Sequence, residues 1–129
     1  MPYVIPTLRI RDRATLQHWV DAFGFQLHAV YPEQGDHVDH AQLRLGDGWI
    51  MAGTPREGGV GQQPGQAACY WVLEQPADVD AVHVRALAAG ATSIVEPNDP
   101  DYGGRGCSLK DREGNLWSFG TYAPKDAPR

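Results

Sequence analysis

The feature that most constrains the fold of this chain is an internal repeat of one strand, one helix and three strands. The first copy predicts a strand over residues 3–10, a helix over 13–23 and strands over 25–31, 38–45 and 48–52. The second copy predicts a strand over 68–73, a helix that ends at Gly90, and strands over 93–95, 105–110 and 116–122. Two βαβββ units in tandem predict an α+β fold built from two similar modules.

Two stretches of sequence support the repeat. Residues 8–12 align with residues 71–78 if the second copy carries an insertion at 75–77, and residues 48–52 align with 116–120 without a gap. This alignment makes Trp49 the equivalent of Trp117. Strand alternation places both side chains, together with Trp71, on the side of the sheet that faces the helices. The alternative is that one of these tryptophans lies at a dimer interface or lines a groove for an aromatic ligand.

The ends of the two helices have recognisable signals. Asp12 is a good N-cap for the first helix, and Gly24 ends it as a C′ residue should. Asp78 or Asp80 is expected to cap the second helix. The first helix carries an apolar stripe that includes Trp19, which predicts that this tryptophan lies in the core.

The division of the 129-residue chain follows from the repeat. We expect one domain, with module 1 over about 3–53, a linker over 54–66, module 2 over about 67–122 and a tail over 123–129. The segment between the modules is rich in glycine and has one aliphatic residue, Val60. It is either a plain linker or a mobile flap over a ligand, and the sequence leaves both open.

Charge and hydropathy exclude several classes of partner. A net charge of −5 argues against nucleic acid, whose phosphates need a basic face. No apolar stretch approaches the roughly 20 residues of a membrane span, and the start of the chain lacks the features of a signal peptide. Cys69 and Cys107 are isolated, as expected of buried thiols in a reducing cytoplasm.

Alternation along the strands separates an apolar face from a polar one. The polar face is either solvated or forms the wall of a cleft. It is predicted to carry Thr7, Arg9, His28, His40, Gln42, Arg44 and Tyr70.

Three motifs carry a resemblance to a known superfamily. They are the turn and strand over residues 111–120, the strand over 40–46, and the Leu8, Ile10 and Asp12 pattern before the first helix. Together they resemble the vicinal oxygen chelate superfamily, which includes glyoxalase I, bleomycin-resistance proteins and extradiol dioxygenases. The resemblance is strongest to its small bacterial glyoxalase-like subgroup. It implies a U-shaped cleft lined by a mixed sheet, helices on the outer face, and a homodimer.

The resemblance also implies a metal site that this chain lacks. Metal-dependent members bind one divalent ion through His, Gln or Glu side chains from the first and last strand of each module. The corresponding places here hold Ile5, Ile50, Ala68 and Ser118, none of which is a usable ligand. We therefore expect no metal and no other cofactor. His37 and Asp39 lie near His28 and His40, but alternation points His40 the other way, which disfavours a separate metal site.

Three further residues complete the candidate binding site. Tyr102 is the single aromatic residue of the loop over 97–104, and Ser118 replaces the metal-binding glutamate of the superfamily. Arg105 either reaches a ligand anion or forms an ion pair with Asp99, Asp101 or Asp111. The candidate ligand-binding residues are Thr7, Arg9, His40, Gln42, Arg44, Tyr70, Tyr102, Arg105 and Ser118.

Four functions remain open at this stage. The first is a metal-free homodimer that sequesters a small natural product, as in antibiotic resistance. The second is a metal-free enzyme in which His28 or His40 serves as acid or base. The third is a metal-dependent lyase, isomerase, thiol transferase or dioxygenase. The fourth is a protein that keeps the fold without a distinct small-molecule role.

Overall fold

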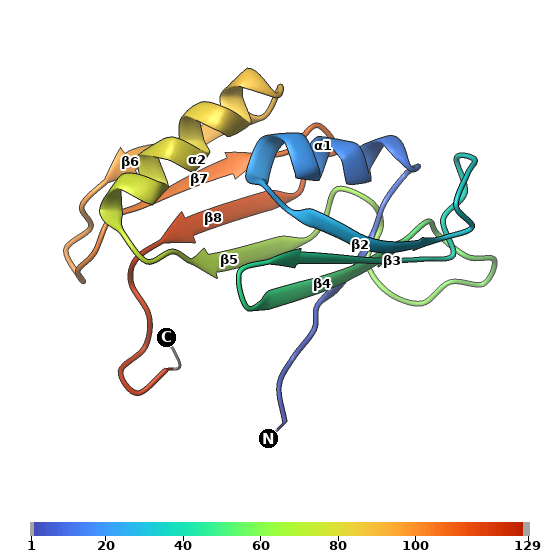
Figure 1. Cartoon of the computed structure of the whole chain (residues 1–129), viewed down its shortest axis with the longest axis horizontal. Helices are drawn as coiled ribbons and strands as arrows, with labels where there is room; N and C mark the ends of the chain where they lie inside the picture. Colours follow the sequence, from blue (N-terminus) through green and yellow to red (C-terminus); the bar gives the residue numbers. More distant parts are fainter. Residues whose placement is uncertain (1, 128–129) are drawn as a thin grey trace.

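The computed structural model describes residues 2–127, which form two helices and two four-stranded sheets (Figure 1). The first module contains β1 (Thr7–Arg9), α1 (Ala14–Phe23), β2 (Gln26–Tyr31), β3 (His40–Leu45) and β4 (Gly48–Gly53). The second contains β5 (Ala68–Val72), α2 (Pro76–Ala88), β6 (Thr92–Asn98), β7 (Gly106–Lys110) and β8 (Leu116–Gly120). The predicted α+β fold of two βαβββ modules is confirmed. Residues 128 and 129 of the expected tail lie outside the described residues.

The two sheets have the same topology. Their strand orders are β1-β4-β3-β2 and β5-β8-β7-β6, with the first strand of each module parallel to the last and the other pairs antiparallel. Both helices lie side by side on one side of the sheets, and the segments over 2–6 and 121–127 lie on the other side (Figure 1). Each sheet therefore has one face under the helices and one open face.

The helix ends follow from local sequence. Gly24 ends α1 in the left-handed conformation at φ 82°, as predicted. The prediction that Asp12 is the N-cap of α1 is wrong by one residue: Arg13 is the N-cap, and the Asp12 carboxylate accepts a hydrogen bond from the Ala14 backbone N–H at 2.9 Å just before the helix. The prediction that Asp78 or Asp80 caps α2 is wrong by a few residues. Gln75 is the N-cap because Pro76 already begins the helix, and Asp78 completes a capping box as the third helical residue.

The core joins the modules rather than filling each separately. Trp19 of α1 packs edge-on against Trp117 of β8 at 5.3 Å between ring centroids, and Phe23 lies 5.1 Å from Trp117 and 5.4 Å from Phe119. All four side chains are almost completely buried. The helix of the first module thus covers the sheet of the second, so the apolar faces of both modules form one hydrophobic core.

A buried aspartate holds the turn between β7 and β8. One carboxylate oxygen of Asp111 accepts hydrogen bonds from the backbone N–H groups of residues 113–115. The other accepts hydrogen bonds from Asn115 and from the indole N–H groups of Trp19 and Trp117, at 2.8–2.9 Å. Because these donors come from both modules, Asp111 links the turn to α1 as well as to β8.

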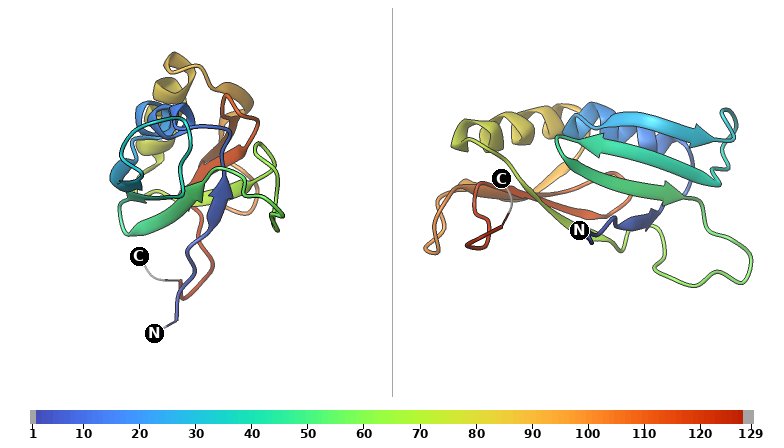
Figure 2. Two further views of the ribbon diagram at one scale, coloured as in Figure 1. Left: turned by 90° about the vertical axis from the view of Figure 1, so that its right-hand side faces the viewer. Right: turned by 60° about the horizontal axis from the view of Figure 1, so that its bottom comes forward.

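Two segments of the chain lie outside the packed strands and helices. The first strand is shorter than predicted, since residues 3–6 precede it and Val4 is 85% exposed. The segment over 54–66 projects away from the sheets (Figure 2), and Val60 within it is exposed. Within the described chain, neither helix is long and apolar enough to cross a membrane.

Candidate functional site

The open face of the second sheet carries a pocket of about 260 Å³. Four strands and two flanking segments contribute to it. Its lining includes Tyr70, Val95, Tyr102, Ser108, Ser118 and Tyr122. Four predicted site residues are thus brought together, namely Tyr70, Tyr102, Arg105 and Ser118. Thr7, Arg9, His40, Gln42 and Arg44 do not line this pocket, because they belong to the first sheet.

The floor of the pocket is a row of side chains that crosses the sheet. Tyr70 pairs with Ser118, Ser118 with Ser108, and Ser108 with Val95, so these residues stand at one level of four neighbouring strands. The two serine hydroxyls are 2.7 Å apart and hydrogen-bonded. One proton is used in that bond, which leaves the other hydroxyl proton able to reach an acceptor on a ligand.

Paired glycines make the next row hollow. Gly106 of β7 and Gly120 of β8 lie directly opposite each other, and two residues along each strand they share the face of Ser108 and Ser118. A methyl group on Gly120 would lie 2.4 Å from the Tyr70 hydroxyl oxygen. The missing side chain of Gly120 therefore makes room for the Tyr70 ring, and that of Gly106 leaves the depression open.

Tyrosines form the rim of the pocket. Tyr102, from the loop before β7, packs edge-on against Tyr122 at 5.1 Å between centroids. The Tyr70 hydroxyl donates a hydrogen bond to the Tyr122 carbonyl at 2.6 Å, which ties the segment after β8 to the edge strand β5. Tyr122 was not among the predicted site residues, since only its packing against Tyr102 reveals its position.

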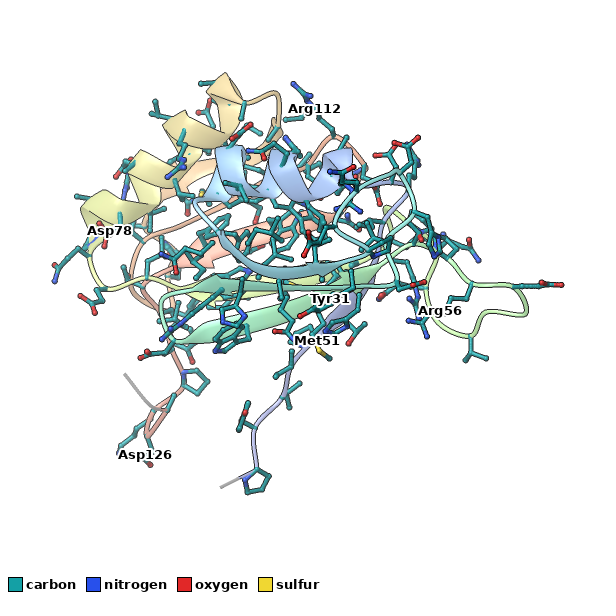
Figure 3. All side chains as sticks on the ribbon, turned by 45° about the vertical axis from the view of Figure 1, so that its right-hand side comes forward. Tyr31, Met51, Arg56, Asp78, Arg112 and Asp126 are labelled. Atoms are coloured by element: carbon teal, nitrogen blue, oxygen red, sulfur yellow. The ribbon has the colours of Figure 1, made fainter. Side chains whose placement is uncertain are left out.

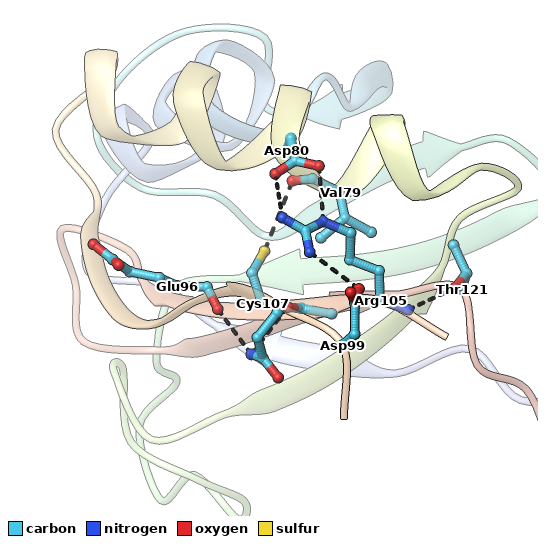
Figure 4. A network of polar contacts seen from close by, with 9 residues as sticks. Val79, Asp80, Glu96, Asp99, Arg105, Cys107 and Thr121 are labelled. Atoms are coloured by element: carbon cyan, nitrogen blue, oxygen red, sulfur yellow. Dashed lines mark hydrogen bonds and ion pairs between the residues drawn. The ribbon is translucent and has the colours of Figure 1, made fainter. Parts of the chain in front are cut away.

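Arg105 lines the pocket, and its guanidinium group forms ion pairs with two aspartates (Figure 4). Its Nε and Nη2 both donate to the Asp80 carboxylate at 2.9 Å, and its Nη1 donates to Asp99 at 3.0 Å. Hydrogen bonding to these carboxylates raises the pKa of Arg105, and the reciprocal bond from Arg105 lowers the pKa of Asp80. The ion-pair alternative is the observed one, although the principal partner, Asp80, was not foreseen.

The cysteine beneath the pocket is inert. Cys107 is buried between β7 and α2, and burial raises the pKa of its thiol to about 11. Burial also raises the pKa of Cys69. Both thiols are therefore protonated at neutral pH and are poor nucleophiles.

The first sheet gathers a separate polar group on its open face. Gln42 lies between two histidines, with its Oε1 3.2 Å from His28 Nδ1 and its Nε2 3.0 Å from His40 Nε2. The amide therefore accepts from the protonated Nδ1 of His28 and donates to the unprotonated Nε2 of His40. Thr7 and Arg9 lie on β1 of the same sheet.

Trp49 belongs to this open face and not to the core, which corrects the prediction from the repeat. Its ring contacts His28 edge-on at 5.0 Å, and the Arg44 guanidinium lies 5.3 Å from its centroid. Ile50, the next residue, is completely buried. The gapless alignment was therefore displaced by one residue, and Ile50 is the structural counterpart of Trp117.

His37 takes part in a structural contact at the base of the loop between β2 and β3. Its Nε2 lies 2.6 Å from Asp39 and its Nδ1 2.9 Å from the Thr54 hydroxyl, which also bonds to the Val38 backbone. Among residues 2–127, no group of three or more His, Cys, Asp or Glu side chains is placed to hold a metal ion.

The sequence matches a family model for the glyoxalase/bleomycin resistance protein/dioxygenase superfamily over residues 10–119. The chain belongs to this superfamily. No curated protein matches the chain.

Solved structures of the superfamily share the fold. TioX from Micromonospora sp. ML1 is 28% identical, with a TM-score of 0.74 over 98% of this chain and 100% of its own. A glyoxalase-related enzyme from Fulvimarina pelagi is 18% identical, with a TM-score of 0.72 over 93% of this chain and 87% of its own. The fosfomycin resistance protein FosX from Listeria monocytogenes, solved with Mn(II), is 14% identical, with a TM-score of 0.70 over 96% and 92%.

The places where the superfamily holds its metal do not fit a metal in this chain. Since Ile50 faces the core, the open-face residue of β4 is Met51, which pairs with Thr7 of β1 and Gln42 of β3. Figure 3 shows Met51 on the side of the sheet turned away from the helices. The corrected set is Ile5, Met51, Ala68 and Ser118. Its donors are one hydroxyl and one thioether, which cannot replace imidazole and carboxylate ligands for a divalent ion.

Proposed function

We propose that the protein binds a small molecule on its open face without a metal ion, as a homodimer that sequesters its ligand. The observation that carries this proposal is the combination of a formed pocket with apolar or weakly binding residues at all four superfamily ligand places. The second module keeps the shape of a binding site and lacks the donors for metal-assisted chemistry. The homodimer is carried over from the superfamily resemblance.

A role in antibiotic resistance is a second part of this proposal, and it is supported by resistance proteins of the same superfamily. FosX is described as a fosfomycin resistance protein, and the superfamily includes bleomycin-resistance proteins. A binder with this fold would protect a cell by holding the compound rather than by transforming it.

Metal loading tests the metal-free proposal directly. The protein, purified without a histidine tag, is incubated with Mn, Fe(II), Co, Ni or Zn, desalted and analysed by mass spectrometry for bound metal. FosX from Listeria monocytogenes serves as the positive control. We expect no stoichiometric metal, because no described cluster offers three suitable ligands. Stoichiometric metal would overturn the proposal and favour a metal-dependent enzyme.

A second candidate, acid–base catalysis without metal, is favoured by the contact between His28, Gln42 and His40. Ligands found in a thermal-shift screen separate the two candidates. Recovery of the unchanged compound after prolonged incubation supports binding. Conversion that disappears in both His28→Ala and His40→Ala supports catalysis. Sedimentation analysis of the same samples tests the homodimer.

A further inference from the structure

The size of the pocket in the second sheet sets the size of the group that it can hold. An apolar cavity of about 150 Å³ holds one benzene ring. The pocket measures about 260 Å³, which matches a system of about two fused rings. This inference rests on the proposed function, since it names the class of ligand for the same pocket.

The shape of the pocket favours a flat group. The hollow over Gly106 lets a ring approach the backbone of β7, where a side chain would hold it off, whereas the Tyr70 ring fills the space over Gly120. Tyr70 stands beside this hollow, and Tyr102 and Tyr122 stand at its rim. Aromatic rims contribute offset or edge-on ring contacts, and these depend on a planar partner.

The floor of the pocket selects a polar substituent on that ring. Ser108 and Ser118 share one hydrogen bond, so the pair retains a donor for an uncharged acceptor such as a carbonyl or amide oxygen. A ring alone would leave that donor covered and without an acceptor, which costs free energy.

The charges around the pocket disfavour an anion. Arg105 lines the pocket, but Asp80 and Asp99 behind it occupy its guanidinium, so these three groups together carry one excess negative charge. Asp101 adds a further carboxylate to the exposed loop beside Tyr102. Coulomb repulsion from this rim weakens binding of a carboxylate or phosphonate.

From these four observations we infer that the pocket binds a flat aromatic group of about two fused rings that is uncharged or cationic and carries a hydrogen-bond acceptor. The hollow holds the ring, the tyrosines contact its edges and faces, and the serine pair donates to the acceptor. Small aliphatic anions, the chemistry of a phosphonate, do not match this site.

Matched probes test each part of the inference. Isothermal titration calorimetry compares 2-naphthamide with 2-naphthoate, which has the same ring and an anionic substituent, and with the saturated decahydronaphthalene-2-carboxamide, which is not flat. We expect 2-naphthamide to bind and each analogue to bind about tenfold more weakly or worse, from charge repulsion in one case and lost ring contacts in the other.

Variants assign the binding to this pocket. Tyr102→Ala removes an exposed rim ring and is expected to weaken 2-naphthamide binding about fivefold, the loss typical of one aromatic contact. Gly106→Ala puts a methyl group into the hollow and is expected to weaken it further. Tyr3→Ala removes an equally exposed tyrosine outside the pocket and should change nothing. Circular dichroism verifies that each variant is folded.

The inference is overturned if 2-naphthamide fails to bind up to its solubility limit. It is also overturned if 2-naphthoate binds as tightly as 2-naphthamide. A third contrary result is that Tyr102→Ala and a folded Gly106→Ala both bind 2-naphthamide like the wild type. None of these outcomes bears on metal content, which is measured separately. Stoichiometric metal would overturn the proposed metal-free function. The preference of the pocket for an aromatic ring would still be decided by the titrations.

Discussion

His18 is a histidine that the fold holds in its neutral form. It lies on the inner side of α1, is only 6% exposed, and its Nε2 accepts a hydrogen bond from the Arg112 backbone N–H at 3.1 Å. Figure 3 places Arg112 beside the two helices. Burial lowers the pKa of His18, and the Arg112 guanidinium lowers it further. The carboxylates of Asp111 and Asp21 and the Ala89 carbonyl act in the opposite direction without reversing the shift.

The sign of this shift predicts a loss of stability in acid. An unfolded chain protonates His18 near its ordinary pKa of 6.5, whereas the folded protein resists protonation until a lower pH. The contribution of His18 is therefore complete above pH 6.5 and declines as the pH falls from 6.5 toward the folded pKa. Urea unfolding at a series of pH values should show a shallower acid slope in His18→Gln than in the wild type.

His28→Gln is the matched control, because His28 is exposed on the other side of the sheet. Its unfolding free energy should keep the wild-type dependence on pH. An unchanged slope in His18→Gln would mean that His18 does not couple the fold to pH.

At the scale of elements, α1 is anchored to the second module by a buried glutamate. The Glu113 carboxylate accepts the Arg11 backbone N–H at 3.2 Å and also the Thr15 hydroxyl, so one side chain of the β7–β8 turn holds the start of α1. Glu113 is 7% exposed, and little solvent competes for these bonds.

A double-mutant cycle measures this anchor. Thr15→Ala and Glu113→Ala should show a coupling energy of about 1 kcal/mol in urea unfolding, because each removes one partner of the same partly buried hydrogen bond. The exposed pair of Gln17 and Asp21 on the same helix is the control, with an expected coupling below about 0.5 kcal/mol. Equal coupling in the two cycles would show that burial adds nothing to the anchor.

The order and type of the elements were predictable because their signals are local. Gly24 ends α1 as expected, and the two modules repeat the same order of strands. Register was less predictable. Matching Trp49 to Trp117 joined two large aromatic residues, whereas the buried side chains of β4 are Ile50 and Ala52. That alternating apolar pair was the signal that could have set the register correctly.

The sequence predicted those site residues whose side chains line the pocket, but not the glycines that leave space for it. Tyr70, Tyr102, Arg105 and Ser118 were foreseen and lie at one pocket. Gly106 and Gly120 were not, because their place beside Tyr70 depends on the register of β7 and β8. Of the two partners of Arg105, Asp99 was foreseen and Asp80 was not, since Asp80 lies 25 residues away on α2.

At the scale of the whole molecule, the two modules are not independent folding units. Trp19 and Phe23 of the first module are buried against Trp117 and Phe119 of the second, and Phe25 packs against Trp71 at 5.0 Å. Removing either module would expose several aromatic side chains at once, so neither half keeps a sufficient core alone. The two copies of the repeat thus share a topology, but neither copy is expected to fold without the other.

Because each module buries aromatic side chains of the other, the chain is suited to fragment complementation. The segment over 54–66 projects from the sheets and joins halves that hold each other through their interiors. A specific protease site introduced at residues 58–61 should therefore yield, after cleavage, two peptides that elute together from a sizing column and unfold cooperatively. Either half expressed alone should be unfolded. Peptides that separate without denaturant would instead mean that the covalent connection, and not the shared interior, keeps the two modules together.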